Sequence, residues 1–143
     1  MAGRLDGKVA VITGGVSGIG LGTVELFVAE GAQVVAADIQ DEKGAMLERR
    51  FPGKVKYSHC DVTSEADIAA TMQLAKSEFG GLDILFNNAG ISDRMTSIAE
   101  ITADGIRDEK VKVLKSLRHF LQGWHKYFWD IATAIGAKMA FTI

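Results

Sequence analysis

Strand-like and helix-like segments alternate from Lys8 to Asn88, and this alternation is what most limits the folds open to the chain. Short runs rich in β-branched residues predict four strands, over residues 8–13, 32–38, 54–60 and 82–87. The segments between them read as helices, over residues 21–31, 40–51 and 61–80. Strands joined through helices run parallel by right-handed crossovers. We therefore predict a doubly wound α/β fold, with helices on both faces of a parallel sheet.

Single residues predict where these helices begin, end and face the core. Gly31 stands where the first helix should end, and Pro52 followed by Gly53 should stop the second. Thr63 is the expected N-cap of the third. The apolar stripe of the first helix is expected at Leu21, Val24, Leu26 and Val28.

The pattern changes near Gly105. Residues 107–143 contain no convincing strand, and apolar residues at three- and four-residue steps predict two amphipathic helices that meet near Gly123. We therefore divide the chain into a first domain, residues 1–105, and a divergent helical tail, residues 106–143. The tail either covers the apolar edge left by the fourth strand or docks to a partner, and the sequence alone leaves both open.

Composition excludes several classes of protein. The 143 residues are enough for one hydrophobic core, and 48% apolar with 24% charged residues is typical of a soluble protein. A net charge of −2 gives no field for binding nucleic acid or an acidic membrane. Cys60, the single cysteine, excludes an internal disulfide and suits a reducing compartment. Asp130 and Lys138 interrupt the longest apolar segment, so we expect no membrane span and a cytoplasmic location.

The segment "VAVITGGVSGIG", Val9 to Gly20, places a glycine-rich turn between the first strand and the first helix. A helix that starts directly after a strand aims unpaired N–H groups and its positive dipole end beyond the sheet, where a pyrophosphate fits if no side chain blocks it. Gly14, Gly18 and Gly20 provide tight turning, close approach and close helix–strand packing, and Ser17 adds a hydroxyl. A glycine-rich turn without a ligand is the alternative.

Asp38 ends the second expected strand, about twenty residues past the glycines. A carboxylate at this place can accept hydrogen bonds from the ribose hydroxyls of an adenosine. No lysine or arginine adjoins Asp38 to hold a 2′-phosphate, which the acid would repel, so the pattern favours NAD over NADP. A solvated acid at a strand end is the alternative.

Three motifs together resemble one family. "TGGVSGIG" (residues 13–20), "CDV" (60–62) and "NNAG" (87–90) are similar to the fingerprint of the short-chain dehydrogenases/reductases, from about Lys8 to about Gly105. The resemblance implies that residues 1–105 form a Rossmann-like dinucleotide-binding domain, truncated before the helical tail. It also implies an oxidoreductase that uses NAD to transfer hydride to or from an alcohol or carbonyl group.

The resemblance also assigns roles to individual positions. The residues implied to bind the cofactor are Gly14, Ser17, Gly18, Ile19 and Gly20 at the phosphates, Asp38 at the adenosine ribose, Asp61 and Val62 at the adenine, and Asn88, Ala89 and Gly90 at the nicotinamide-side ribose. Asn87 is implied to tie the sheet together. Asp61 also fits a first-turn acid or cap of the following helix, and both roles are compatible.

The family's acid–base group has no counterpart in these 143 residues. The family uses a tyrosine with a lysine four positions later, joined by a serine and a helical asparagine, to move the alcohol proton. Here Tyr57 is followed by Asp61 and Tyr127 by Ile131, and no asparagine occurs after Asn88. We therefore predict no catalytic residue by resemblance.

The remaining reactive side chains give no metal site and no clear base. His119 and His125 are not spaced as a zinc pair on one helix face, and no cysteine supports them. Lys126 adjoins Tyr127, but neighbouring helical residues point about 100° apart. Cys60 reads as a small buried residue rather than a nucleophile.

Three functions follow from these observations. The favoured one is an NAD(H)-binding domain of a short-chain dehydrogenase that is catalytically incomplete. The second is a working enzyme whose acid–base group is unrecognised or comes from another subunit. The third is a shortened, non-catalytic variant that pairs with a full-length dehydrogenase, as a homo- or hetero-oligomer, through the helical tail.

Overall fold

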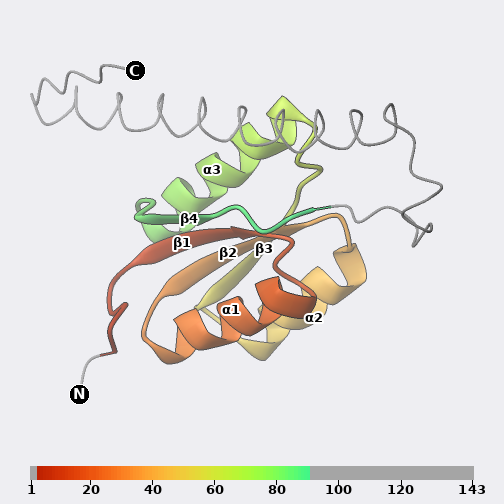
Figure 1. Ribbon diagram of the computed structural model, residues 1–143. Coiled ribbons are helices and arrows are strands. Elements are labelled where there is room, and N and C mark those ends of the chain that lie inside the picture. Colours follow the sequence, from red (N-terminus) through yellow and green to blue (C-terminus); the bar gives the residue numbers. More distant parts are fainter. Residues whose placement is uncertain (1–2, 91–143) are drawn as a thin grey trace, which may run out of the picture.

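Residues 3–90 are described by the structure, a computed structural model, and they form an alternating strand–helix chain (Figure 1). Its elements in chain order are β1 (Val9–Thr13), α1 (Gly18–Ala29), β2 (Gln33–Asp38), α2 (Asp41–Arg50), β3 (Val55–His59), α3 (Glu65–Phe79) and β4 (Ile84–Phe86). Each expected strand and helix of this region is present. The predicted boundary near Gly105 and the helical tail, with any association through it, lie outside the described residues.

The four strands form one parallel sheet in the order β3-β2-β1-β4. The two central strands are in register from Val9 opposite Gln33 to Thr13 opposite Ala37. In Figure 1, α1 and α2 lie on one face of this sheet and α3 on the other. The predicted doubly wound α/β fold is confirmed. Because all strands run the same way, all their carboxyl ends meet at one edge.

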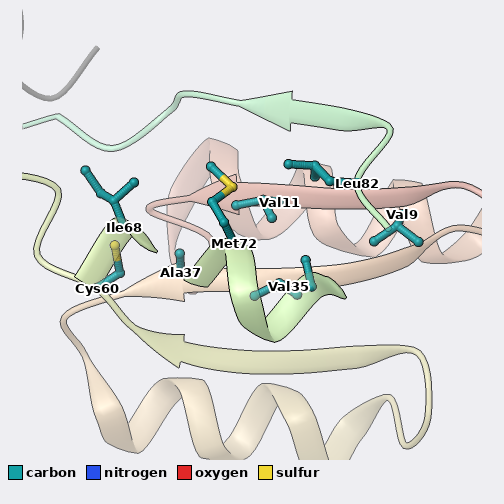
Figure 2. Packing of buried hydrophobic residues seen from close by; sticks show 9 residues of the cluster. Val9, Val11, Val35, Ala37, Cys60, Ile68, Met72 and Leu82 are labelled. Carbon is teal, nitrogen blue, oxygen red and sulfur yellow. The ribbon is translucent and has the colours of Figure 1, made fainter. Parts of the chain in front are cut away.

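The core is divided by the sheet into two layers. All five residues of β1 are buried, as expected for a strand covered on both faces. Val9 and Val11 belong to the buried cluster on the α3 face of the sheet, which also contains Ile68 and Met72 (Figure 2). Each fully buried aliphatic side chain contributes about 1.5–3 kcal/mol. The alternate residues of β1 therefore fix where α3 lies.

The opposite layer packs α1 and α2 against the sheet. Ala10, Ile12 and Ala36 of β1 and β2 pack with Val24 of α1 and Leu47 of α2. Alanines in the central strands let α1 approach the sheet closely.

Within the described part of the chain, no helix is long and apolar enough to cross a membrane.

Two expectations about helix detail are wrong. The N-cap of α3 is Ser64 rather than Thr63, and its hydroxyl accepts a hydrogen bond from the Asp67 amide at 3.3 Å. Thr63 instead donates to Asp61 from both its amide and its hydroxyl. Leu26 is 52% exposed, because it lies about half a turn around α1 from the buried Val24.

The first-helix ending follows the sequence more closely. Helix α1 ends with Glu30 at its C-cap, and Gly31 follows with a φ of +96°. Only glycine adopts this left-handed backbone without strain. Gly31 therefore turns the chain directly into β2, as predicted.

Candidate functional site

A cavity of about 540 Å³ lies where the four strands end. Each strand sends its following residues into the wall of this cavity, so the site is assembled by the parallel topology itself. The lining residues are Gly14, Ser17, Asp38, Ile39, Gln40, Cys60, Asp61, Val62, Thr63, Asn88, Ala89 and Gly90. The volume is within the usual range for small-molecule sites, about 300–1,000 Å³.

The glycine turn brings the start of α1 against the end of β1. Gly14 and Gly18 have φ values of +63° and +51°, which favour glycine. A Cβ on Gly20 would overlap the Gly14 carbonyl and would lie 2.7 Å from the Asn88 Nδ2. Gly20 is therefore a packing position, and neither it nor Gly18 lines the cavity.

The first turn of α1 is suited to an anion. Ser17 is the N-cap, but its side chain makes no capping hydrogen bond, and the first turn contains no acidic residue. The first turns of α2 and α3 both contain acidic side chains. The first N–H groups of a helix have no partner within the helix, so the start of α1 offers donors without a competing carboxylate. Ile19, predicted to lie at the phosphates, is 76% exposed and does not line the cavity.

Thr13 and Asn88 fasten the end of β4 to the end of β1. The Thr13 hydroxyl accepts hydrogen bonds from the amides of Asn88 and Ala89, both at 3.0 Å. The Asn88 side chain donates to the carbonyls of Thr13 at 3.1 Å and Gly14 at 3.3 Å. The sheet-tying role expected of Asn87 therefore belongs to Asn88, whereas Asn87 is exposed.

Asp38 is a nearly buried carboxylate at the end of β2, only 7% exposed. Its Oδ1 accepts from the Gln40 amide and from Gln40 Nε2, each at 3.2 Å, while its Oδ2 accepts a long 3.4 Å bond from the Val16 amide. Gly14, Ser17 and Asp38 thus line one cavity, although the sequence separates the acid from the glycine turn.

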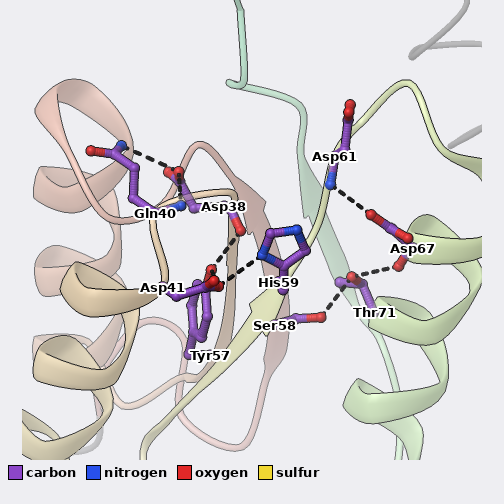
Figure 3. Close-up of polar contacts among 9 residues, drawn as sticks. All are labelled: Asp38, Gln40, Asp41, Tyr57, Ser58, His59, Asp61, Asp67 and Thr71. Atoms are coloured by element: carbon purple, nitrogen blue, oxygen red, sulfur yellow. Dashed lines mark hydrogen bonds and ion pairs between the residues drawn. The ribbon is translucent and has the colours of Figure 1, made fainter.

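Asp61 and Val62 line the cavity from the end of β3. The amide of Thr63 and its hydroxyl donate to Asp61 Oδ1 at 2.9 and 2.7 Å, and these bonds lower the pKa of the Asp61 carboxyl. Asp67 accepts from the Asp61 amide, which ties the loop to α3 (Figure 3). The Asp61 carboxylate therefore stabilises the turn before α3, and Asp61 also forms part of the cavity wall.

Four lining residues were missed by sequence reasoning. All lie within two positions of a predicted site residue along the chain, and this nearness is the only signal that could have found them: they are Ile39, Gln40, Cys60 and Thr63. Burial raises the pKa of the Cys60 thiol, which keeps it protonated near neutral pH and agrees with its expected role as a small buried residue.

A polar cluster braces the outer rim of the site (Figure 3). Asp41 Oδ1 accepts from the Tyr57 hydroxyl at 2.8 Å and lies 2.7 Å from His59 Nδ1. The Tyr57 hydroxyl also donates to the Asp38 carbonyl at 2.7 Å. The bond to Asp41 raises the pKa of His59, and the bonds from His59 and Tyr57 lower the pKa of Asp41. Burial and then Asp41 raise the pKa of Tyr57.

Comparison with known proteins places these features in a family. The family model of the short chain dehydrogenase matches residues 8–123. Momilactone A synthase from Oryza sativa subsp. japonica is 59% identical over 92 residues, covering 64% of this chain and 34% of the relative. The (+)-borneol dehydrogenase 1 from Salvia officinalis is 43% identical over 122 residues, covering 85% and 46%. The chain thus spans less than half the length of these curated relatives.

A solved structure has the same architecture. The 3-ketoacyl-(acyl-carrier-protein) reductase from Brucella melitensis, complexed with NADH, superposes with a TM-score of 0.79 at 29% sequence identity. The likeness covers 94% of this chain and 55% of that one.

Two glycines of α1 allow a matched test of the close packing. Gly20→Ala should destabilise the protein by about 1–3 kcal/mol, because its Cβ would overlap the Gly14 carbonyl. Gly22→Ala, with nothing within 4 Å of the added Cβ, should stabilise it by about 0.5–1 kcal/mol. Urea unfolding of both variants measures the difference. Equal effects of the two substitutions would contradict the packing role of Gly20.

The Asp41–His59 pair predicts a pH dependence of stability. The raised pKa of His59 adds stability that is complete below its unfolded value of 6.5 and is lost as pH rises through the folded value. The lowered pKa of Asp41 adds stability that is present above 3.8 and is lost as pH falls through the folded value. The pair should therefore contribute most between these two values.

Urea unfolding of the wild type and Asp41→Asn, from this range up into alkaline solution, measures that contribution. The excess stability of the wild type should shrink as the solution becomes alkaline, and NMR should show the His59 titration midpoint falling toward 6.5 in the variant. His59→Asn identifies the His59 signal. A midpoint that Asp41→Asn leaves unmoved would show that the ion pair does not form in solution.

Proposed function

Because the chain belongs to the short-chain dehydrogenase family, whose Rossmann fold binds NAD or NADP, we propose that residues 3–90 form the NAD(H)-binding part of an oxidoreductase acting on alcohol or carbonyl groups. The observation that carries the proposal is a buried carboxylate, Asp38, placed in the same cavity as an acid-free helix N-terminus. A dinucleotide has the matching pair of features, a charged pyrophosphate and a ribose with free hydroxyls.

The residues present fit such a cofactor. Gly14 and Gly20 leave no Cβ between the end of β1 and the start of α1, so the N–H groups of the first helical turn would hold the pyrophosphate, with the Ser17 hydroxyl as a further donor. Asp61 and Val62 would flank the adenine. When bound, the nicotinamide supplies or accepts the hydride.

The far end of the cavity suits the other half of the dinucleotide. Ala89 and Gly90 follow β4 and line the cavity, and Gly90 has no atom within 4 Å of an added Cβ. Asn88 holds this segment against Thr13, so its backbone would lie beneath the nicotinamide-side ribose as a rigid surface. The hydrogen bonds between Asn88 and Thr13 would keep this backbone close to the ribose and so exclude water from beneath it.

The preference for NAD over NADP rests on charge at Asp38. A 2′-phosphate placed against this carboxylate would bring like charges together in a nearly buried site, which is costly. Among the residues of 3–90 that line the cavity, none is a lysine or arginine that could neutralise the phosphate.

A cytoplasmic location is part of the proposal, supported by the single reduced cysteine, Cys60.

We further propose that the 143 residues alone hold the cofactor without turning over an alcohol. Neither tyrosine of the sequence has a lysine four positions later. Tyr57 is committed to the Asp38 carbonyl and to Asp41, and its raised pKa opposes the phenolate that a general base requires.

Paired substitutions of two nearby acids test the ribose assignment. Asp38→Asn should weaken NAD binding about 10- to 100-fold, because charge-assisted hydrogen bonds to the ribose are lost. It should leave NADP binding unchanged or stronger. Asp41→Asn, at the start of α2, removes the same charge three positions further along and should change NAD affinity less than about threefold. Calorimetric titration with each nucleotide measures the four affinities. Equal losses in the two variants would remove Asp38 from the ribose site.

Activity assays test the catalytic proposal separately. The purified chain, saturated with NAD and offered a panel of secondary alcohols, should form reduced cofactor no faster than a sample without protein. Absorbance of the reduced nicotinamide is the measurement. Turnover that tracks protein concentration would instead support a working enzyme with an unrecognised acid–base group.

A further inference from the structure

Gln40 makes an unusual set of contacts beside the ribose-binding acid. Its backbone amide and its side-chain Nε2 both donate to Asp38 Oδ1, each at 3.2 Å. Its Oε1 accepts from Lys43 Nζ at 2.7 Å. Lysine, glutamine and aspartate thus form a continuous chain of hydrogen bonds that starts on the surface of α2 and ends in the cavity wall, where Gln40 and Asp38 both lie (the glutamine–aspartate contacts are drawn in Figure 3).

The polarity of this chain is fixed by chemistry. A lysine ammonium only donates hydrogen bonds, and an ionised carboxylate only accepts them. The Gln40 amide therefore has one orientation that satisfies both neighbours, with Oε1 toward Lys43 and Nε2 toward Asp38. The lysine charge polarises the amide in the sense that strengthens its bond to the carboxylate.

The two oxygens of Asp38 consequently differ. A carboxylate oxygen has about two acceptor positions, and both positions on Oδ1 are taken by Gln40. Oδ2 receives only the long 3.4 Å bond from Val16. Oδ2 is therefore the oxygen with acceptor capacity left for a ligand.

The Asp38 carboxylate needs hydrogen bonds to hold its orientation, because its own side-chain torsion restrains it only weakly. The last torsion of an aspartate side chain has broad, two-fold preferences, so the group turns readily unless hydrogen bonds hold it. The Gln40 backbone amide supplies one bond, and the side chain supplies the second. Two donors on the same oxygen leave the other oxygen in a defined place before any ligand arrives.

We propose that Gln40 is a positioning residue for cofactor recognition, holding Asp38 Oδ1 so that Oδ2 alone accepts the 2′-hydroxyl of the adenosine ribose, with Lys43 fixing the Gln40 amide. The inference rests on the proposed NAD binding and goes beyond it. In this arrangement Asp38 does not accept hydrogen bonds from both ribose hydroxyls, because one of its two oxygens is already bonded to the protein. Selectivity for the 2′-hydroxyl then depends on a residue outside the family motifs.

Gln40→Met tests the proposal, because it keeps the side-chain length and the backbone amide while removing Nε2 and Oε1. The readout is the ratio of affinities for NAD and for nicotinamide 2′-deoxyadenosine dinucleotide, measured by calorimetry on the full chain. The wild type should prefer NAD, and Gln40→Met should reduce this preference about three- to tenfold. Affinity for the 2′-deoxy nucleotide should change less than about twofold, since that nucleotide lacks the hydroxyl concerned.

Gln73→Met, on the exposed face of α3, is the matched control and should leave the ratio unchanged. Lys43→Met provides a second variant that does not alter the site itself. It should reduce the preference by less than Gln40→Met does, and the double variant should equal Gln40→Met alone, because Lys43 acts through Gln40.

The outcomes separate this inference from the proposed function. A wild-type chain that binds neither nucleotide would overturn NAD binding itself. NAD binding with an unchanged ratio in Gln40→Met, or with equal weakening for both nucleotides, would overturn the positioning role and leave NAD binding standing. Additive losses in the double variant would remove Lys43 from the chain of contacts.

Discussion

The close approach of α1 to the end of β1 is the constraint on which the site depends. A Cβ at Gly20 would overlap the Gly14 carbonyl and crowd the Asn88 amide, so the start of α1, the end of β1 and the distant Asn88 meet at one point that only glycine permits. The same contact places the first turn of α1 over the sheet edge, and Asn88 carries it across to the end of β4. Packing and ligand recognition therefore share one set of atoms.

The two acids of the site divide their oxygens in a similar way. Asp38 Oδ1 accepts from the amide and side chain of Gln40, and Asp61 Oδ1 accepts from the amide and hydroxyl of Thr63. In each case both donors belong to one residue, which lies two positions after the acid in the turn that leads toward the next helix. A local turn thus restrains one oxygen of each carboxylate and leaves the other outside that turn's hydrogen bonds.

The sequence predicted those parts of the structure that local pattern determines. Alternation gave the strands, and the glycine spacing with Asp38 placed the cavity at the correct edge of the sheet. What failed depended on choices between neighbours. Ser64 rather than Thr63 caps α3, because Thr63 is taken by Asp61. Asn88 rather than Asn87 joins the strands, because successive residues at a strand end face opposite ways. Gln40 escaped notice because its role needs the positions of Asp38 and Lys43 in space.

The surroundings of Tyr57 oppose proton transfer from its hydroxyl. A tyrosine that exchanges a proton with an alcohol near neutral pH needs a cation nearby to lower its pKa. Tyr57 has the opposite surroundings, since burial raises its pKa and the Asp41 carboxylate, which accepts a hydrogen bond from its hydroxyl, raises it further. Its hydroxyl also bonds the Asp38 carbonyl and so braces the end of β2. The same phenol cannot both hold the end of β2 and give up its proton, so Tyr57 is unsuited to act as an acid–base group.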